Sequence, residues 1–170
     1  MSPNSNNYPG TSLSEKEIQE GKVLSIHDKL LGGFSWDTGT AIGQYLASLK
    51  DGVILGSYCA KCRKTVVPPR TVCEWCYRPM AEYVPLEDTG VINTFSLCYV
   101  TWDVKRIKVP EIPAVIDLDG ASPLHGIMHK LGEVQPDQVK IGMRVQAVWK
   151  PAAEREGAIT DILYFKPFEE

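Results

Sequence analysis

Several features that would place a sequence in a functional class at once are missing from this chain of 170 residues. Its apolar runs are far shorter than the roughly 20 residues that cross a bilayer, and its polar opening has no signal-peptide character. It has no basic excess, since 18 Lys and Arg stand against 21 Asp and Glu, whereas polyanion-binding proteins take much of their affinity from basic side chains. The glycine-rich patterns that cradle phosphates are absent as well. We therefore expect a soluble cytoplasmic protein without membrane spans.

Cysteine is scarce, but four of the five cysteines form two C-x-x-C pairs close together in the sequence; these are Cys59, Cys62, Cys73 and Cys76. In a reducing compartment, paired elements of this kind bind metal or carry out redox chemistry more often than they form structural disulfides. Two such knuckles facing each other supply the four thiolates of a tetrahedral zinc site, with no position left for a water or a substrate. The spacing therefore predicts a structural Zn²⁺ ion, with iron as the chemical alternative.

The segment around these cysteines, 53–84, is too short to form a hydrophobic core of its own. A bound metal would then contribute to its folding free energy, by roughly 10 to 16 kcal/mol in small zinc peptides. Arg63 and Tyr77 follow the second cysteine of each knuckle, where a glycine would turn more easily. We predict a zinc ribbon over 53–84 that unfolds when one thiolate is removed.

The N-terminal part of the chain carries helical signals after a polar tail. The composition of 1–12 cannot bury a core, so we expect it to be disordered. Ser14 and Glu17 have the spacing of a capping box, which predicts a short helix. Apolar residues recur at helical spacing over about 38–50 and predict a second, amphipathic helix. Together these signals predict a helical N-terminal arm over 13–52.

The remainder, 85–170, reads as β structure. Runs of β-branched and aromatic residues alternate with turn residues and predict five strands. These strands cover 91–102, 113–118, 124–131, 144–150 and 157–165. Five strands, of which the first is long enough to bend, fit a small, partly open Greek-key barrel of the OB type. The fold class is therefore mainly β, with N-terminal helices, a rubredoxin-like zinc ribbon and a C-terminal five-stranded OB-fold barrel.

The predicted barrel is the acidic part of the chain. Residues 84–170 hold nine Lys and Arg against thirteen Asp and Glu, whereas residues 55–83 hold five against two. The second and third predicted strands contain no Phe, Tyr, Trp or Arg, although OB folds bind single strands by stacking bases on aromatic rings in a basic groove. These counts argue against a single-stranded nucleic-acid-binding protein, the natural alternative for this fold.

Two groups of residues are candidates for surface contacts. Phe34 and Trp36 bring much apolar area to a Gly-rich loop, which indicates partner docking. Lys105, Arg106 and Lys108 form the densest basic cluster, in a predicted loop that could hold phosphates by charge-assisted hydrogen bonds. The alternative for the basic cluster is a solvated loop.

Three side chains of reactive type lack a supporting motif. We expect Cys98, in the first barrel strand, to be a small buried residue rather than a nucleophile. His125 and His129 are four residues apart, which in a strand would place them on one face. No carboxylate motif accompanies them. We therefore expect packing or surface roles for both.

The motifs together resemble a known family. The matching elements are Tyr45-Leu46, the segment from Gly52 to Tyr58, both C-x-x-C pairs, Pro68-Pro69-Arg70, Gly90 and the run from Ile141 to Val145. They resemble the acyl-CoA-associated, thiolase-linked family of unknown function, in which a rubredoxin-like zinc ribbon precedes an OB fold.

The resemblance implies a role rather than a reaction. It implies a non-catalytic accessory protein that binds acyl-CoA beside thiolase or HMG-CoA synthase type enzymes of lipid and isoprenoid metabolism. On this reading Lys105, Arg106 and Lys108 would contact the CoA phosphates. The alternatives at this stage are a single-stranded nucleic-acid-binding protein and a rubredoxin-like iron electron carrier.

Overall fold

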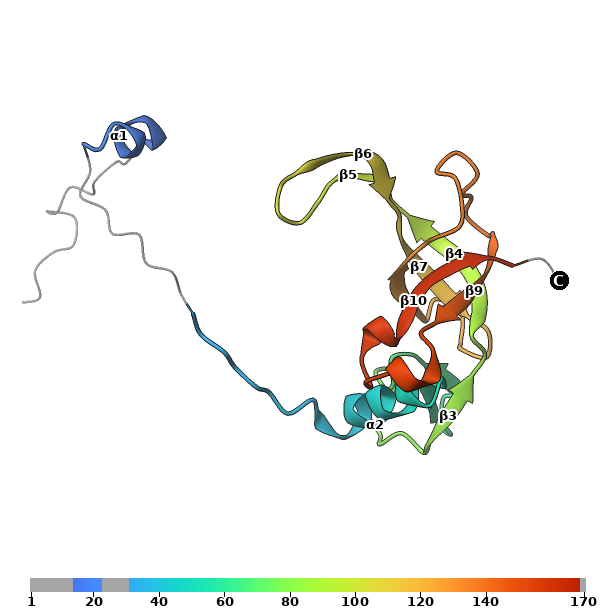
Figure 1. Ribbon diagram of the computed structural model, residues 1–170. Helices are drawn as coiled ribbons and strands as arrows, with labels where there is room; N and C mark the ends of the chain where they lie inside the picture. The colour runs from blue at the N-terminus through green and yellow to red at the C-terminus, as the bar shows by residue number, and fades with distance from the viewer. Residues whose placement is uncertain (1–13, 23–30, 169–170) are drawn as a thin grey trace, which may run out of the picture. The chain divides into compact units, whose positions relative to one another are not determined.

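The computed structural model describes residues 14–22 and 31–168, in two units that are treated separately (Figure 1). The first unit, Met1–Trp36, contains helix α1 (Glu15–Gln19). Its capping box forms as predicted: the Ser14 hydroxyl accepts a hydrogen bond from the Glu17 N–H at 3.3 Å, and the Glu17 carboxylate accepts one from the Ser14 N–H at 3.1 Å. The predicted tail over 1–12 lies outside the described residues.

The second unit, Asp37–Glu170, begins with helix α2 (Gly39–Lys50), which confirms the amphipathic helix predicted over about 38–50. Ala41, Tyr45 and Leu49 form its buried stripe. The helix ends where Gly52 adopts a φ of +78° and donates its N–H to the Leu49 carbonyl at 3.0 Å, because glycine takes this left-handed conformation without a steric penalty.

Three short antiparallel strands follow the helix and carry the cysteine knuckles. They are β1 (Ile54–Cys59), β2 (Lys64–Val66) and β3 (Glu82–Leu86), with β1 in the centre. Cys59 is the last residue of β1, so the first knuckle is also the turn between β1 and β2. The second knuckle lies in the long connection from β2 to β3.

A five-stranded sheet in the order β10-β9-β4-β7-β8 forms the rest of the unit. Its strands are β4 (Thr89–Phe95), β7 (Pro113–Leu118), β8 (Gly126–Lys130), β9 (Arg144–Trp149) and β10 (Ile162–Pro167). The edge strands β8 and β10 approach each other at one end, where Leu131 and Phe165 form a parallel bridge. The predicted mainly β fold with a five-stranded barrel is confirmed.

The first barrel strand differs from its prediction. The run 91–102 does not continue as one strand, because the chain leaves the sheet after the Ser96 N–H donates to the Pro113 carbonyl at 3.0 Å. Beyond that point β5 (Cys98–Val100) and β6 (Arg106–Glu111) pair only with each other among the strands that the structure describes. They form a hairpin that extends away from the barrel (Figure 1).

The basic cluster therefore lies partly in a strand rather than in a loop. Arg106 and Lys108 belong to β6, and Arg106 pairs with Val100 across the hairpin. The sequence of β6 has no buried face, with exposed or half-buried residues throughout. Since strand prediction relies on an apolar face, a strand fixed only by its hairpin partner gives no such signal.

The last predicted strand, 157–165, begins later than expected. Two 3₁₀ turns, η2 (Ala152–Glu154) and η3 (Ile159–Asp161), precede β10. The buried Asp161 carboxylate accepts hydrogen bonds from the N–H groups of Glu156, Gly157 and Ala158, at 2.7 to 3.1 Å. These bonds hold 156–158 in a turn around the carboxylate and keep the segment out of the sheet.

One hydrophobic core joins the helix, the ribbon and the barrel. Tyr45 and Leu49 of α2 and Ile54 and Val67 of the ribbon belong to the same buried cluster as Phe165 and the other barrel residues. None of the helices in the described part of the chain has both the length and the apolar composition that a membrane crossing requires.

Candidate metal centre and surface sites

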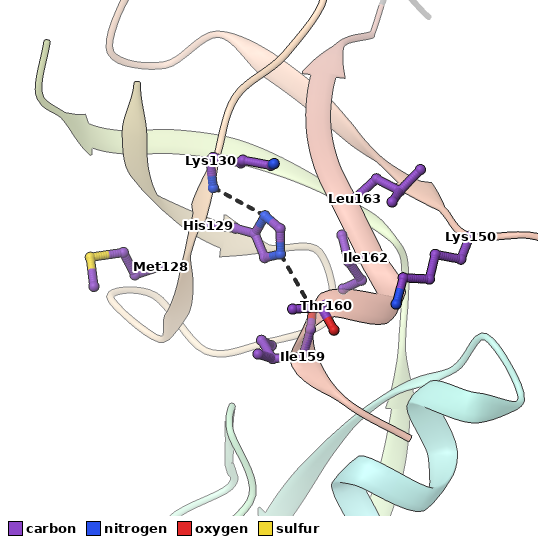
Figure 2. A pocket seen from close by; sticks show the side chains of 8 residues that line it. All are labelled: Met128, His129, Lys130, Lys150, Ile159, Thr160, Ile162 and Leu163. Atoms are coloured by element: carbon purple, nitrogen blue, oxygen red, sulfur yellow. Dashed lines mark hydrogen bonds between the residues drawn. The ribbon is translucent and has the colours of Figure 1, made fainter. Parts of the chain in front are cut away.

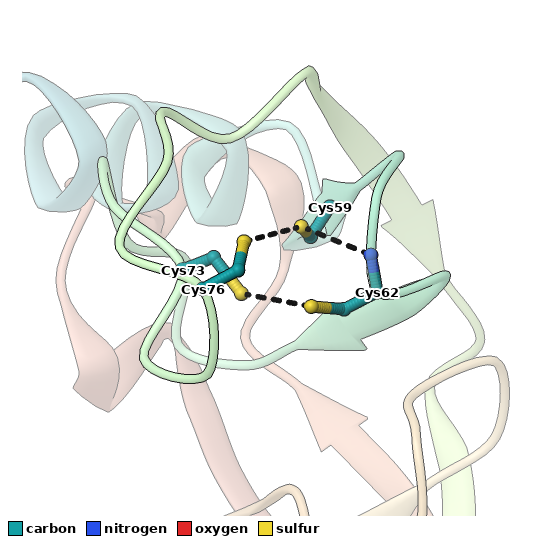
Figure 3. Close-up of side chains that lie close together, drawn as sticks. All are labelled: Cys59, Cys62, Cys73 and Cys76. Atoms are coloured by element: carbon teal, nitrogen blue, oxygen red, sulfur yellow. Dashed lines mark hydrogen bonds between the residues drawn. The ribbon is translucent and has the colours of Figure 1, made fainter.

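The two knuckles bring the sulfur atoms of Cys59, Cys62, Cys73 and Cys76 together (Figure 3). All four sulfurs lie within 4.8 Å of one another. The Cys59 and Cys76 sulfurs are 3.7 Å apart, and those of Cys62 and Cys73 are 3.8 Å apart. A disulfide requires about 2.05 Å between sulfurs, so these pairs are thiols.

The spacing of the sulfurs fits a tetrahedral metal ion. With Zn–S bonds of about 2.3 Å, the edge of a regular tetrahedron is about 3.8 Å, which matches both measured pairs. Cys59 and Cys73 are buried, while Cys62 and Cys76 are half-buried. The four residues can therefore enclose an ion without leaving a coordination position for a substrate.

The environment of the thiols favours a bound cation. Burial first, and then hydrogen bonding by Cys76, Cys73 and Cys59, raises the pKa of Cys62 to about 12. Burial also opposes ionisation of Cys73, but the N–H groups of Cys76 and Trp75 outweigh it and lower the pKa of this thiol to about 7. Crowded thiols of this kind cannot all ionise together unless a cation balances the charge.

Both knuckles turn through a left-handed residue. Arg63 and Tyr77 have φ values of +53° and +56° and donate their N–H groups to the carbonyls of Cys59 and Cys73, at 2.7 and 2.9 Å. These are the two positions at which the sequence lacks the expected glycine. The knuckles close nonetheless, at the steric cost that a side chain has in this conformation.

His125 joins the barrel to the ribbon. Its ring packs edge-on against Trp75 with centroids 5.1 Å apart, and its Nε2 lies 3.8 Å from the Glu74 carboxylate. Burial lowers the pKa of His125. Thr65 and Ser122 reinforce the junction, since the Thr65 N–H donates to the Ser122 hydroxyl at 3.0 Å and the Ser122 N–H donates to the Thr65 carbonyl at 2.9 Å.

The β5–β6 hairpin, residues 98–111, exposes apolar and basic side chains together. Trp102 is 96 % exposed and Val104 is 82 % exposed at the turn. The Lys105 ammonium pairs with the Asp103 carboxylate at 2.6 Å, and Arg106 and Lys108 are exposed on β6. The three predicted basic residues thus lie on one projecting element.

A second surface feature lies where the barrel does not close, between β8 and the η3–β10 segment (Figure 2). We call this open cavity of about 500 Å³ the seam trough. His129 spans it: its Nδ1 accepts the Lys130 N–H at 3.0 Å, and its Nε2 lies 3.5 Å from the Ile159 carbonyl. Burial lowers the pKa of His129 and favours the neutral ring.

The reactive side chains flagged in the sequence do not gather. Cys98 begins β5 and is half-buried rather than buried, because β5 leaves the barrel. His125 precedes β8 and contacts the ribbon, whereas His129 lies in β8 and contacts Phe165 and η3. The two histidines therefore have separate packing partners.

Sequence reasoning overlooked two exposed apolar features. The sequence places Trp102 at the end of the predicted strand 91–102 without indicating its exposure. Met128, 73 % exposed at the seam trough, gives no signal beyond its place in a predicted strand. Phe34 and Trp36, by contrast, are 83 % and 85 % exposed in the first unit. The exposure of an apolar side chain can be recognised from sequence only where the residue lies in a predicted loop, as Phe34 and Trp36 do.

The fold and the cysteine cluster define a zinc-ribbon protein with an OB-fold domain. Models of the ChsH2 rubredoxin-like zinc ribbon domain and of the ChsH2 C-terminal OB-fold domain match residues 47–79 and 83–150. Both domains of the chain are therefore similar to those of ChsH2-type, DUF35 proteins, and the resemblance drawn from the motifs is confirmed.

Similar proteins carry related names. A DUF35 domain-containing scaffold protein of Methanocaldococcus jannaschii is 29 % identical over 119 residues, which span 68 % of this chain and 82 % of the relative. A DUF35 protein of unknown function from Sulfolobus solfataricus has a similar structure, with a TM-score of 0.55, 26 % identity, and coverage of 65 % of this chain and 79 % of that one.

A third similarity concerns the fold alone. A chain of the solved structure described as an Ltp2–ChsH2(DUF35) aldolase aligns with a TM-score of 0.57 and 19 % identity. The alignment covers 78 % of this chain and 98 % of that chain.

Proposed function

We propose that this protein is a non-catalytic accessory protein that docks on a thiolase or HMG-CoA synthase type enzyme and holds acyl-CoA for it. The DUF35 relative from Methanocaldococcus jannaschii is named a scaffold protein, and a structure of the same fold is described as an Ltp2–ChsH2 aldolase. The first name supports an accessory role, and the second supports an enzyme of aldolase type as a partner. The choice of a thiolase or HMG-CoA synthase type enzyme rests on the motif resemblance.

The observation that carries the proposal is the β5–β6 hairpin. Exposed Trp102, Val104 and Val109 place a large apolar area on an element that pairs only with itself. An isolated two-stranded hairpin is marginally stable in water, and aromatic side chains of this kind anchor protein interfaces. We therefore assign the hairpin as the main docking element, with Phe34 and Trp36 as a second one.

Lys105, Arg106 and Lys108 would contact the CoA phosphates at this interface. Three cationic side chains on one hairpin suit three phosphate groups, because charge-assisted hydrogen bonds from Arg and Lys to phosphate are strong. Lys105 would exchange its Asp103 partner for a phosphate oxygen. The acidic balance of the remaining barrel confines phosphate binding to this element.

The four cysteines would hold zinc, whose role is structural. The closed donor set and the sulfur spacing support this assignment, and four thiolates also suit iron. Metal analysis of the purified chain separates the two: a colourless protein with one zinc per chain is expected. A red protein with a reversible visible spectrum would instead identify an iron electron carrier.

The docking hypothesis is tested by co-purification with a thiolase-type enzyme of the same organism. A Trp102→Ala and Val104→Ala double variant is expected to lose at least tenfold in affinity, because truncation of a central interface anchor costs about 2 kcal/mol or more. Ile141, 70 % exposed elsewhere, provides the matched control Ile141→Ala. Equal binding by both variants would exclude the hairpin as the docking element.

A further inference from the structure

The seam trough is a consequence of how the barrel ends. Strands β8 and β10 are the two edges of the sheet, and within the described residues their backbones join only near Leu131, where the Gly132 N–H donates to the Phe165 carbonyl at 2.9 Å. Toward the other end the edges diverge, and His129 alone reaches across to the Ile159 carbonyl (Figure 2). The trough therefore lies between β8 on one side and the η3–β10 segment on the other.

The walls of the trough are mainly apolar. Met128 is 73 % exposed, Ile159 is 43 % exposed and Leu163 is 37 % exposed. Met128 and Leu163 nonetheless each follow a buried core residue, Ile127 and Ile162. An apolar ligand that covers such side chains gains binding free energy, about 0.8 kcal/mol for each of its methylene groups that leaves water. An open volume of about 500 Å³ lies within the range of ligand sites.

The charged groups of the trough are all cationic. Of the described residues, Lys130 and Lys150 line it and no Asp or Glu does. Lys150 is held by the fully buried Asp161 carboxylate at 3.6 Å, whereas the Lys130 ammonium has no ion-pair partner among the described residues. This balance is opposite to that of the barrel as a whole, which carries more acidic than basic residues.

We infer that the seam trough binds the alkyl chain of a fatty acyl group. The apolar walls would cover the chain, and the Lys130 ammonium would donate a hydrogen bond to the carbonyl oxygen at the head of the chain, in a thioester or in a carboxylate. Two sources share this chemistry, an acyl-CoA and a free fatty carboxylate. The inference rests on the proposed function for its choice of acyl-CoA as the source, but the trough itself is argued from its own lining.

The test measures binding of acetyl-CoA, octanoyl-CoA, CoA and octanoate to the full metal-loaded chain by titration calorimetry. If the trough covers the chain, octanoyl-CoA binds more tightly than acetyl-CoA, by up to about fourfold per covered methylene. A Met128→Ser and Leu163→Ser double variant removes most of this difference and leaves the affinity for acetyl-CoA within about twofold. Both positions are exposed, so the variant is expected to fold.

Controls separate this inference from the proposed function. Ile141→Ser, 70 % exposed and outside both the trough and the hairpin, should keep the full dependence on chain length. Binding of octanoate alone, lost in the double variant, supports the trough and contradicts acyl-CoA as its ligand. Binding of all CoA compounds with equal affinity overturns the trough and leaves the proposed function standing. Absence of binding by any probe overturns both.

Discussion

At the scale of the residue, the knuckles show how strongly cysteine spacing constrains the backbone. Tyr77 holds a φ of +56° although its side chain is 83 % exposed and gains little packing in return. The left-handed conformation costs a non-glycine residue about 1 to 2 kcal/mol. The metal site therefore overrides a local preference at this position.

Replacement of Tyr77 by glycine is expected to stabilise the protein. The steric penalty disappears, and the greater freedom of glycine in the unfolded chain offsets part of the gain, by about 0.5 to 1 kcal/mol. We expect the free energy of unfolding to rise by up to about 1 kcal/mol in denaturant titrations with excess zinc. A decrease would mean that the Tyr77 ring makes a stabilising contact.

Asp161 is the residue whose charge matters most to the local backbone. Burial alone would raise its pKa, but hydrogen bonds from the N–H groups of Ala158, Glu156 and Gly157 outweigh burial and, with Lys150, lower the pKa below the ordinary value of 3.8. Because the folded state favours the carboxylate, its stabilising effect is complete above the ordinary pKa. The effect is lost as the pH falls through the lower pKa of the folded protein.

Asp161→Asn is expected to lower the free energy of unfolding at pH 7. It should also make that free energy depend less on pH in the acid range. At pH 7 the amide cannot accept the same set of N–H groups, so we expect a loss of about 2 kcal/mol. The difference from the unsubstituted protein should shrink as the pH is lowered from 5 to 2, in thermal unfolding followed by circular dichroism. Parallel curves would show that the carboxylate charge contributes nothing.

At the scale of the element, close strand pairing sets the tolerance of the barrel to substitution. A Cβ at Gly90 of β4 would lie 2.4 Å from the Asp117 carbonyl oxygen of β7. A Cβ at Gly43 of α2 would meet only the Thr38 hydroxyl, at 3.4 Å. The two glycines therefore have different roles.

The substitutions Gly90→Ala and Gly43→Ala form a matched pair. Gly90→Ala should destabilise the protein by about 1 to 3 kcal/mol, because the β4–β7 pair must separate to admit the methyl group. Gly43→Ala should be neutral or stabilise it by up to about 1 kcal/mol, because alanine favours the helix. Chemical denaturation measures both, and equal effects would contradict the close pairing of β4 and β7 at Gly90.

At the scale of the whole molecule, the ribbon and the barrel depend on each other. Ile54 and Val67 of the ribbon lie in the core that contains Phe165 of the barrel, and His125 packs on Trp75 across the junction. Loss of the metal would therefore disturb more than the knuckles. The core couples the cysteine site to the barrel strands.

Chelation of the metal is expected to unfold both parts in one transition. A metal contribution of roughly 10 kcal/mol is comparable to the whole stability of an ordinary domain, about 5 to 15 kcal/mol. Amide exchange after chelation should show loss of protection in β7 and β9 as well as in β1. Retained protection in the barrel alone would show that it folds independently, and Cys59→Ser should reproduce whichever result is obtained.

Local patterns were enough to predict most elements. The alternation of Ala114, Ile116 and Leu118 along β7 indicates a half-buried strand, and the stripe on α2 indicates its buried face. The two C-x-x-C pairs identified the residues that cluster. Each of these signals comes from residues a few positions apart, so the chain carries it without reference to its fold.

The remaining features depend on residues far apart in the sequence. The separation of β5 and β6 from the barrel, the common core of ribbon and barrel, and the seam trough between β8 and β10 all arise where distant segments meet or fail to meet. The sequence by itself determined the elements and the metal-ligand candidates, because periodicity and spacing are local. Only the tertiary structure decided which apolar side chains stay uncovered, because exposure depends on what the rest of the chain packs against them.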